Sequence, residues 1–308
     1  MAASQRDVKQ RIDSVKNIRK ITRAMEMVAA ARLRRAEQRI AALRPYAGAI
    51  RRMTRQAAEA AGSEISNLPI LNQHENENRI AILLVTGDRG LAGAFNSQIL
   101  RAGLRAATEH EGEGSDVVFY ASGRRGVSSL GFRGREVAGG YTGFTDRPSY
   151  ADARHIAEDL VTAYVDDKID RVEIFYNGYI SPLVQEVRRE TLLPLQEATI
   201  LEGDEDEDDD REGEGGGDGS GHHALVEYEP DAEEILQRLV PDYVEISIYR
   251  ALLESTASEH GARMTAMRNA SQNAGELIDN LTLQANRARQ AEITQEIMEV
   301  VAGAEALG

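Results

Sequence analysis

The stretch "VTGDRGLAGAFN", residues 85–96, holds the residue types most typical of a ligand-binding loop. Gly87, Gly90 and Gly93 occur where an apolar strand pattern changes into a helical one, and helix N-termini attract phosphates. The spacing does not fit the dinucleotide fingerprint G-x-G-x-x-G, and no Gly-Lys-Ser/Thr follows as in a Walker A loop. The stretch therefore predicts a tight strand-to-helix turn that needs small residues, with a phosphate site as the alternative.

Metal chemistry would need the six histidines or a dense acidic run. His222 and His223 adjoin in a Gly-rich segment, and the other four histidines are scattered without ligand spacing. Residues 202–218 hold eleven acids and one Arg but lack an EF-hand pattern. The chain has no Cys, which excludes thiol catalysis and Cys-ligated zinc. We expect no metal, no cofactor and no catalytic residue.

The C-terminal stretch "LTLQANRARQAEITQEIMEVVAGAEAL", residues 281–307, combines a dense polar block with an apolar end. The polar block consists of Arg287, Arg289, Gln290, Thr294 and Gln295. Beyond it the helix becomes apolar, and apolar surface is stabilised when a partner removes it from water. This end therefore predicts an interaction surface rather than an active site.

Two long helices are predicted to carry these features. Residues 1–44 contain no Pro, and their apolar residues recur at steps of mostly three and four: Val8, Ile12, Val15, Ile18, Ile21, Met25, Val28 and Leu33. The same steps recur after Pro241, and no Pro follows up to residue 308. Pro45 either kinks the first helix or is accommodated in it. Because the two helices come from opposite chain ends, we expect an antiparallel coiled coil.

Charge is segregated along the chain, whose net charge is −15. Residues 1–60 hold fifteen Lys/Arg and five Asp/Glu, whereas residues 242–308 hold ten acids and five bases. The opposite signs support pairing of the two helices. The basic helix carries only Tyr46 as an aromatic, so it is a poor candidate for nucleic acid binding.

Strand and helix patterns alternate between the two long helices. Strands are predicted at 79–86, 116–122, 132–139, 171–179 and 182–194, and helices at 94–110 and 149–167, the latter capped by Ser149. Such alternation predicts a small, mostly parallel, Rossmann-like α/β sheet. The predicted segments are an N-terminal helix 1–60, an α/β domain 75–200, an acidic Gly-rich loop 201–223, a linking segment 224–241 and a C-terminal helix 242–308.

No apolar run approaches the ~20 residues that cross a bilayer, and the N-terminus lacks the apolar core of a secretory signal. These observations predict a protein on the cytosolic side without direct membrane insertion. The residues alone are also consistent with two other classes of protein: a dinucleotide-dependent enzyme with helical arms, and a coiled-coil scaffold or nucleic-acid binder.

Three blocks resemble the γ subunits of bacterial F-type ATP synthases. They are "IDSVKNIRKITRAMEMVAAARLRRAEQ" at 12–38, followed by "RPY", then "TGDRGLAGAFN" at 86–96, and the stretch from "LLESTASEHGARM" to "EVVAGAEAL" at 252–307. The first and third blocks are highly specific, and the likeness covers nearly the whole chain. Ala92 stands where the family usually has Cys or a small residue.

The resemblance implies a rotor shaft rather than an enzyme. In the family the terminal helices form a coiled coil inside a ring of three α and three β subunits, and the α/β domain lies beside the ε subunit and the c-ring. Proton flow turns the c-ring, and the shaft moves each β site through its states. The resemblance implies a peripheral protein on the cytoplasmic face of the bacterial membrane.

Site residues follow from the resemblance alone. It implies contact with the α/β ring at Met25, Arg263, Arg289, Gln290 and Thr294. It implies an apolar bearing at Ile297, Val300, Val301 and Leu307. It implies contact with the c-ring or ε at Tyr228 and Glu229. The acidic loop 202–221 lies where photosynthetic members carry a regulatory insert, and we expect a solvated spacer or a modulator of rotation there.

Overall fold

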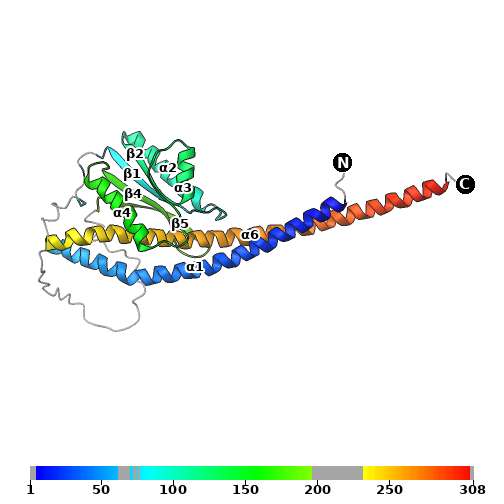
Figure 1. The fold of residues 1–308 in the computed structure, drawn as a ribbon, viewed down its shortest axis with the longest axis horizontal. Helices are drawn as coiled ribbons and strands as arrows, with labels where there is room; N and C mark the ends of the chain where they lie inside the picture. The colour runs from blue at the N-terminus through cyan, green and yellow to red at the C-terminus, as the bar shows by residue number, and fades with distance from the viewer. Residues whose placement is uncertain (1–4, 62–69, 72–73, 75–76, 196–231, 306–308) are drawn as a thin grey trace, which may run out of the picture. The chain divides into compact units, whose positions relative to one another are not determined.

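The computed structural model of the chain describes residues 5–61, 70–71, 74, 77–195 and 232–305. Figure 1 shows the elements, which are, in chain order, α1 (Gln5–Ala61), β1 (Arg79–Val85), α2 (Phe95–Glu113), β2 (Asp116–Ser122), α3 (Arg124–Phe132), β3 (Val137–Tyr141), α4 (Tyr150–Val165), β4 (Arg171–Tyr179), β5 (Gln185–Leu193) and α6 (Ala232–Glu305).

The chain divides into two compact units, which we describe separately. The helical unit comprises residues 1–32, 91–93 and 260–308, and the sheet unit comprises residues 33–90 and 94–259. Helices α1 and α6 each contribute one end to the helical unit and the other end to the sheet unit.

The sheet has five strands in the order β3-β2-β1-β4-β5. Strand β1 pairs in parallel with β2 and with β4, so that Ile82 lies beside Phe119 on one side and Glu173 on the other. Strand β3 continues the parallel arrangement, and β5 closes the opposite edge antiparallel to β4. The prediction of a mostly parallel sheet with a final edge strand is confirmed.

Alternate residues of β1 serve two hydrophobic cores because side chains of a strand point to opposite faces. Ile80, Ile82 and Leu84 pack in one core with α2 and α3. Leu83 and Val85 pack in the other core with α4 and with the part of α6 that belongs to the sheet unit. A strand buried on both faces reads as a continuous apolar run, which is why β1 could be predicted.

Both long helices pass through a proline. Pro45 lies inside α1 and Pro241 lies inside α6, which begins at Ala232, ten residues earlier than the predicted start at 242. A third core of the sheet unit flanks these positions, with Ala47 and Ile50 of α1 packed together with residues of α6. Tertiary packing on both sides offsets the hydrogen bond that each proline removes.

In the helical unit α1 and α6 run antiparallel along an apolar seam. Val8 and Ile12 of α1 pack against Leu281 and Ala285 of α6, and further along α1 Glu26 pairs with Arg268, so the residue numbers of the two helices run in opposite directions. The predicted coiled-coil pair is therefore confirmed.

The prediction was wrong at the third strand, which was placed at 132–139. Helix α3, which was not predicted, ends at Phe132, where that strand was placed to begin, and β3 runs over Val137–Tyr141. Two features hid this arrangement. Phe132, the last residue of α3, is 94% exposed. Gly139 is a poor strand former, and it is needed in β3 because a Cβ at this position would approach the Tyr120 ring at 2.6 Å.

The start of α4 follows the local signal that the sequence carries. The Ser149 side chain accepts a hydrogen bond from the Asp152 amide, and the Asp152 carboxylate accepts one from the Ser149 amide at 2.8 Å. This reciprocal capping box satisfies two amides that the helix itself cannot pair. The predicted cap at Ser149 is confirmed.

A partly buried cluster of charged side chains lies where β4, β5 and α6 meet in the sheet unit. Glu190 of β5 accepts hydrogen bonds from the Tyr176 hydroxyl and from Arg250 Nη2, the latter at 2.8 Å. Glu254 of α6 lies 3.5 Å from Arg188. Burial raises the pKa of Glu254, and the charges of Arg250 and Arg188 offset only part of that effect.

This raised pKa predicts a pH-dependent stability. The folded protein binds the Glu254 proton more tightly than the unfolded chain, so the associated stability is complete below the ordinary pKa of 4.5. It is lost as the pH rises through the folded-state pKa. Glu254→Gln should remove this part of the slope when the free energy of unfolding in urea is measured against pH.

Glu158→Gln is the matched control, since Glu158 is an exposed carboxylate on α4 that pairs with Arg154 at 3.0 Å. It should keep the slope of the parent protein. An unchanged slope in Glu254→Gln would show that Glu254 does not titrate as described.

Candidate functional site: the closed sheet edge and the exposed helical surfaces

The turn after β1 is organised by one carboxylate. Asp88 Oδ1 accepts a hydrogen bond from the Arg124 amide at 2.9 Å, and Asp88 Oδ2 accepts one from the Gly143 amide at 2.9 Å. The Thr145 hydroxyl donates to Asp88 Oδ2 at 3.0 Å. Arg124 is the first residue of α3, so the Asp88 carboxylate occupies a helix N-terminus that would otherwise attract an external anion.

Glycines of this turn permit close approaches. A Cβ on Gly87 would lie 2.8 Å from the Glu259 carboxylate. Gly93 has a φ of 57°, in the left-handed region where glycine carries no steric cost. The Gly87 amide donates to Asn96 Oδ1 at 2.8 Å, which fixes the turn onto the start of α2. The geometry favours the tight-turn reading of these glycines over the phosphate-site reading.

The carboxyl edge of β1 and β4, where open α/β sheets bind ligands, is covered by α6. The Thr256 hydroxyl donates to the Thr145 carbonyl at 2.9 Å, and the Ser258 hydroxyl donates to the Asn177 carbonyl at 3.0 Å. Asn177, at 1% exposure, donates from Nδ2 to the carbonyl of Phe95. The switch point between the two strands is therefore filled by the chain itself.

The space left at this edge is too small for a nucleotide. A cavity of about 10 Å³ remains between Thr86, Thr145 and Ser255, which is at most the room of one water molecule. Within the described ranges no group of three or more His, Asp or Glu side chains could hold a metal ion. At this edge the described residues thus leave no room for a nucleotide.

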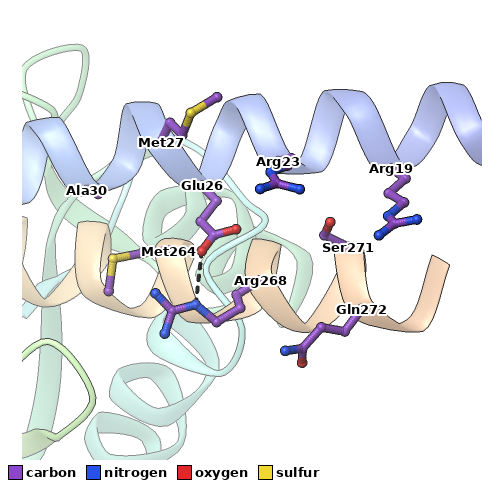
Figure 2. A pocket seen from close by; sticks show the side chains of 9 residues that line it. All are labelled: Arg19, Arg23, Glu26, Met27, Ala30, Met264, Arg268, Ser271 and Gln272. Carbon is purple, nitrogen blue, oxygen red and sulfur yellow. Dashed lines mark hydrogen bonds and ion pairs between the residues drawn. The ribbon is translucent and has the colours of Figure 1, made fainter. Parts of the chain in front are cut away.

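In the helical unit an open groove of about 470 Å³ runs between α1 and α6. Figure 2 shows the residues that line it, which are Arg19, Arg23, Glu26, Met27, Ala30, Met264, Arg268, Ser271 and Gln272. Glu26 and Arg268 reach toward one another across the groove and form an ion pair at 2.9 Å. Arg19 and Arg23 are exposed without an ion pair to any described residue, so the groove is net positive.

The end of α6 continues beyond the seam without a partner in the described chain. Every residue from 289 to 303 is exposed. Ile297, Val300 and Val301 are 57%, 73% and 49% exposed, so an apolar surface faces water. Arg289 and Gln290 are also exposed on this segment.

The remaining predicted contact residues differ in how much of each side chain is exposed to solvent. The Thr294 side chain is exposed, and its hydroxyl donates to the Gln290 carbonyl at 2.8 Å within α6. Met25 is half-buried, whereas Arg263 is 8% exposed and its Nη1 lies 3.4 Å from Nδ1 of His260. Arg263 is thus held inside the helical unit, while the others face outward or partly outward.

Three predicted residues, Tyr228, Glu229 and Leu307, lie outside the described residues. The prediction also missed two features. The groove arginines Arg19 and Arg23 stand four residues apart on one helix face, a spacing that could have indicated them. The role of Asp88 had no such signal, because its hydrogen-bond donors lie at the start of α3 and in the segment after β3, far along the chain.

Comparisons with known proteins decide the family. The sequence model of a family described as ATP synthase matches residues 4–307. An ATP synthase gamma chain of Rubrobacter xylanophilus is 46% identical over 305 residues, which cover 99% of each chain. One of Streptomyces avermitilis is 43% identical over 311 residues, covering 100% of this chain and 97% of that one. The chain belongs to the ATP synthase gamma-chain family. The resemblance read from the sequence is confirmed.

Solved structures with the same fold come from ATP synthases. A chain of the Euglena gracilis mitochondrial enzyme, in an OSCP/F1/c-ring assembly, matches with a TM-score of 0.66 at 17% identity over 98% of this chain and 94% of that one. At this identity the likeness shows the fold alone. A chain of the Tetrahymena thermophila mitochondrial enzyme, in a central stalk and c-ring assembly, matches with a TM-score of 0.58 at 25% identity, covering 82% and 99%.

None of the helices in the described part of this gamma-family chain combines the length and apolarity that crossing a bilayer requires.

The geometry around Asp88 predicts a stability effect. Asp88→Ala should lower the free energy of unfolding by about 2–3 kcal/mol, because the amides of Arg124 and Gly143 lose a charged acceptor. Urea unfolding monitored by circular dichroism measures this change. Asp116→Ala removes an exposed carboxylate at the start of β2 and should change the free energy by less than about 0.5 kcal/mol. Equal effects of the two substitutions would contradict the role given to Asp88.

Proposed function

We propose that the chain is the central rotor shaft of an F-type ATP synthase. It couples proton-driven rotation of the c-ring to the conformational cycling of three catalytic β subunits. The observation that carries this proposal is the end of α6, where the helix continues beyond Ala285 and leaves Ile297, Val300 and Val301 exposed. Such a surface needs a surrounding partner to be removed from water.

The shaft acts by differential contact. It forms no bond with the nucleotide. It biases the conformation of each β subunit because it presents a different surface to each of them, and an effector can shift a conformational equilibrium only through such a difference in contact. The antiparallel seam stiffens α1 and α6 in the helical unit, since two packed helices resist bending better than one. Torque can then pass along the pair.

The apolar end of α6 serves as the bearing. Ile297, Val300, Val301 and, beyond the described residues, Leu307 would lie against the collar formed by the α/β ring. Apolar contacts are non-directional, so rotation breaks few specific bonds. The surface exposure of the first three supports this role.

A few polar contacts set the resting positions of the shaft. Arg289, Gln290 and Thr294 would reach loops of the ring from the exposed part of α6, and Met25 would do so from α1. Arg263 would act from inside the helical unit. The positive groove around Arg19 and Arg23 suits a carboxylate-bearing segment of a partner subunit.

The helices α1 and α6, the latter starting at Ala232 rather than at 242, form the shaft, and the α/β domain 75–200 lies toward the c-ring. The segment 224–241 would meet the c-ring or the ε subunit through Tyr228 and Glu229. The loop 201–223 would be a spacer or a modulator of rotation. The whole is placed peripherally at the cytoplasmic face of the bacterial membrane.

The chain would be a non-catalytic subunit. The closure of the sheet edge by α6 and the carboxylate of Asp88 support this assignment. A dinucleotide-dependent enzyme would instead bind ligand at this edge. Titration of the isolated chain with ATP and with NAD separates the two, because saturable micromolar binding would contradict the shaft.

Co-purification from solubilised membranes tests the assembly. A tagged copy should bring down the α, β and ε subunits and the c-ring, because the proposal places this chain between all of them. Nucleic acid should be absent from the eluate. Recovery of the chain without α and β subunits would contradict the proposal.

The polar contacts predict a defect in coupling. Arg289→Ala combined with Gln290→Ala should lower ATP turnover of the assembled complex about tenfold, since a loss of about 1.4 kcal/mol in the rate-limiting step has that effect. Neither side chain supports the seam, so the helix content should stay at the parental value. ATP hydrolysis and proton pumping in reconstituted vesicles measure the outcome.

Arg287→Ala combined with Gln284→Ala is the matched control, because it removes the same two side-chain types from exposed positions of the same helix. It should retain most of the turnover. Parental turnover in the Arg289 and Gln290 variant would remove these two residues from the proposed contacts.

A further inference from the structure

A histidine is buried among charged side chains on the α2 side of the sheet. His110 lies near the C-terminal end of α2 and is 6% exposed, and Glu173 of β4 is 1% exposed. Glu173 points to the same face of the sheet as Phe175, which packs in the core that β1 forms with α2 and α3. This core is therefore apolar at its centre and polar where α2 meets β4.

Arg189 of β5 holds the Glu173 carboxylate by two hydrogen bonds. Its Nε donates to Oε2 and its Nη2 donates to Oε1, each at 3.0 Å. Paired bonds of this kind fix the plane of the guanidinium group. The hydrogen bond to Glu173 raises the pKa of Arg189, so this side chain remains a donor at every pH at which an imidazole titrates.

The His110 Nε2 atom lies between a donor and an acceptor. It is 3.1 Å from Nη2 of Arg189 and 3.3 Å from Oε2 of Glu173. A guanidinium group can only donate a hydrogen bond, and an ionised carboxylate can only accept one. Nε2 carries either a lone pair or a proton, so it can bond to only one of these two partners at a time.

Further charged side chains surround this group. On α2, Glu113 lies 3.8 Å from Nδ1 of His110, and Glu109 lies 3.4 Å from the guanidinium group that holds Glu173. On β4, Arg171 lies 3.3 Å from Glu173. Strands β1 and β2 and helix α3 contribute apolar side chains to the neighbouring core. A proton on Nδ1 of His110 can therefore point toward a carboxylate.

We propose that His110 is a proton-dependent switch between β5 and β4. The neutral ring carries its proton on Nδ1 and accepts a hydrogen bond from Arg189 at Nε2, which joins α2 to β5. The protonated ring donates from Nε2 to Glu173, which joins α2 to β4 and leaves Arg189 bonded to Glu173 without the imidazole. Histidine is the side chain suited to such an exchange, because an unperturbed imidazole changes its charge between about pH 5 and 8.

The switch acts on the edge of the sheet. β5 is the last strand in the sheet order and pairs with β4. One of its side-chain bonds to α2 exists only while His110 is neutral, and protonation replaces it with a bond between α2 and the neighbouring strand. The two arrangements form a two-state element that a local change in proton concentration biases.

Nuclear magnetic resonance of the ring nitrogens tests the switch on the full chain. The chain is prepared with isotope-labelled histidine, and His110→Gln assigns the His110 signals among the six histidines. At about pH 8 the spectrum should show a protonated Nδ1 and an unprotonated Nε2. At about pH 5 the Nε2 proton should exchange slowly with water, because it is buried and bonded to Glu173. His155, which is exposed on α4, should show no slowly exchanging ring proton.

Arg189→Met removes the donor and keeps an unbranched side chain. The neutral ring should then carry its proton on Nε2 and donate to Glu173. The ratio of the two neutral tautomers should change by at least about tenfold, since a hydrogen bond to a charged group contributes more than about 1.4 kcal/mol.

Arg188→Met is the matched control, because Arg188 is the neighbouring arginine of β5, points to the other face of the sheet and lies 3.5 Å from Glu254. It should keep the parental tautomer ratio. Circular dichroism checks that both variants keep their helix content.

A parent chain whose neutral His110 carries its proton on Nε2 would overturn the proposal, and this measurement decides even if Arg189→Met fails to fold. An unchanged tautomer ratio in folded Arg189→Met would also overturn it. So would a His110 ring that stays neutral at about pH 5, because the bond from the protonated ring to Glu173 would then not form.

Discussion

The apolar seam between the first and last helices is the constraint on which the rest of the structure depends. Val8 and Ile12 meet Leu281 and Ala285, so the two ends of the chain are packed together. Everything between them must leave α1 and return to α6, and the five-stranded sheet is therefore an insertion between two halves of one helical pair. Because α6 also contributes to a core of the sheet unit, the same helix belongs to both cores.

The packing of α6 against the sheet also changes what the carboxyl edge of the sheet can bind. In doubly wound folds the carboxyl edge at the switch point is free to bind a ligand. Here hydroxyl groups of Thr256 and Ser258 bond to that edge, and Asp88 satisfies the start of α3. The edge has become an internal joint that holds loops and helix together. The edge that binds ligands in other doubly wound folds is thus bonded to α6 in this chain.

Much of the fold could be predicted because its signals are local. The spacing of Val8 and Ile12, the apolar run of β1 and the capping Ser149 each depend on a few neighbouring residues. The helix α3 could not, since it is short and ends in an exposed Phe132. The burial of Arg263 and the bonding of Asp88 depend on segments far along the chain, which no window of sequence reveals.

The exposed end of α6 affects the stability of the chain when it is not bound to other subunits. An isolated helix of about 20 residues is only marginally stable in water, and this one has no packing partner after Ala285 among the residues that the structure describes. A partner that enclosed this end would stabilise the helix there, so its folding and its binding would be coupled. In a copy of the chain without partner subunits, this end of α6 would therefore unfold first and be the first site of cleavage by proteases.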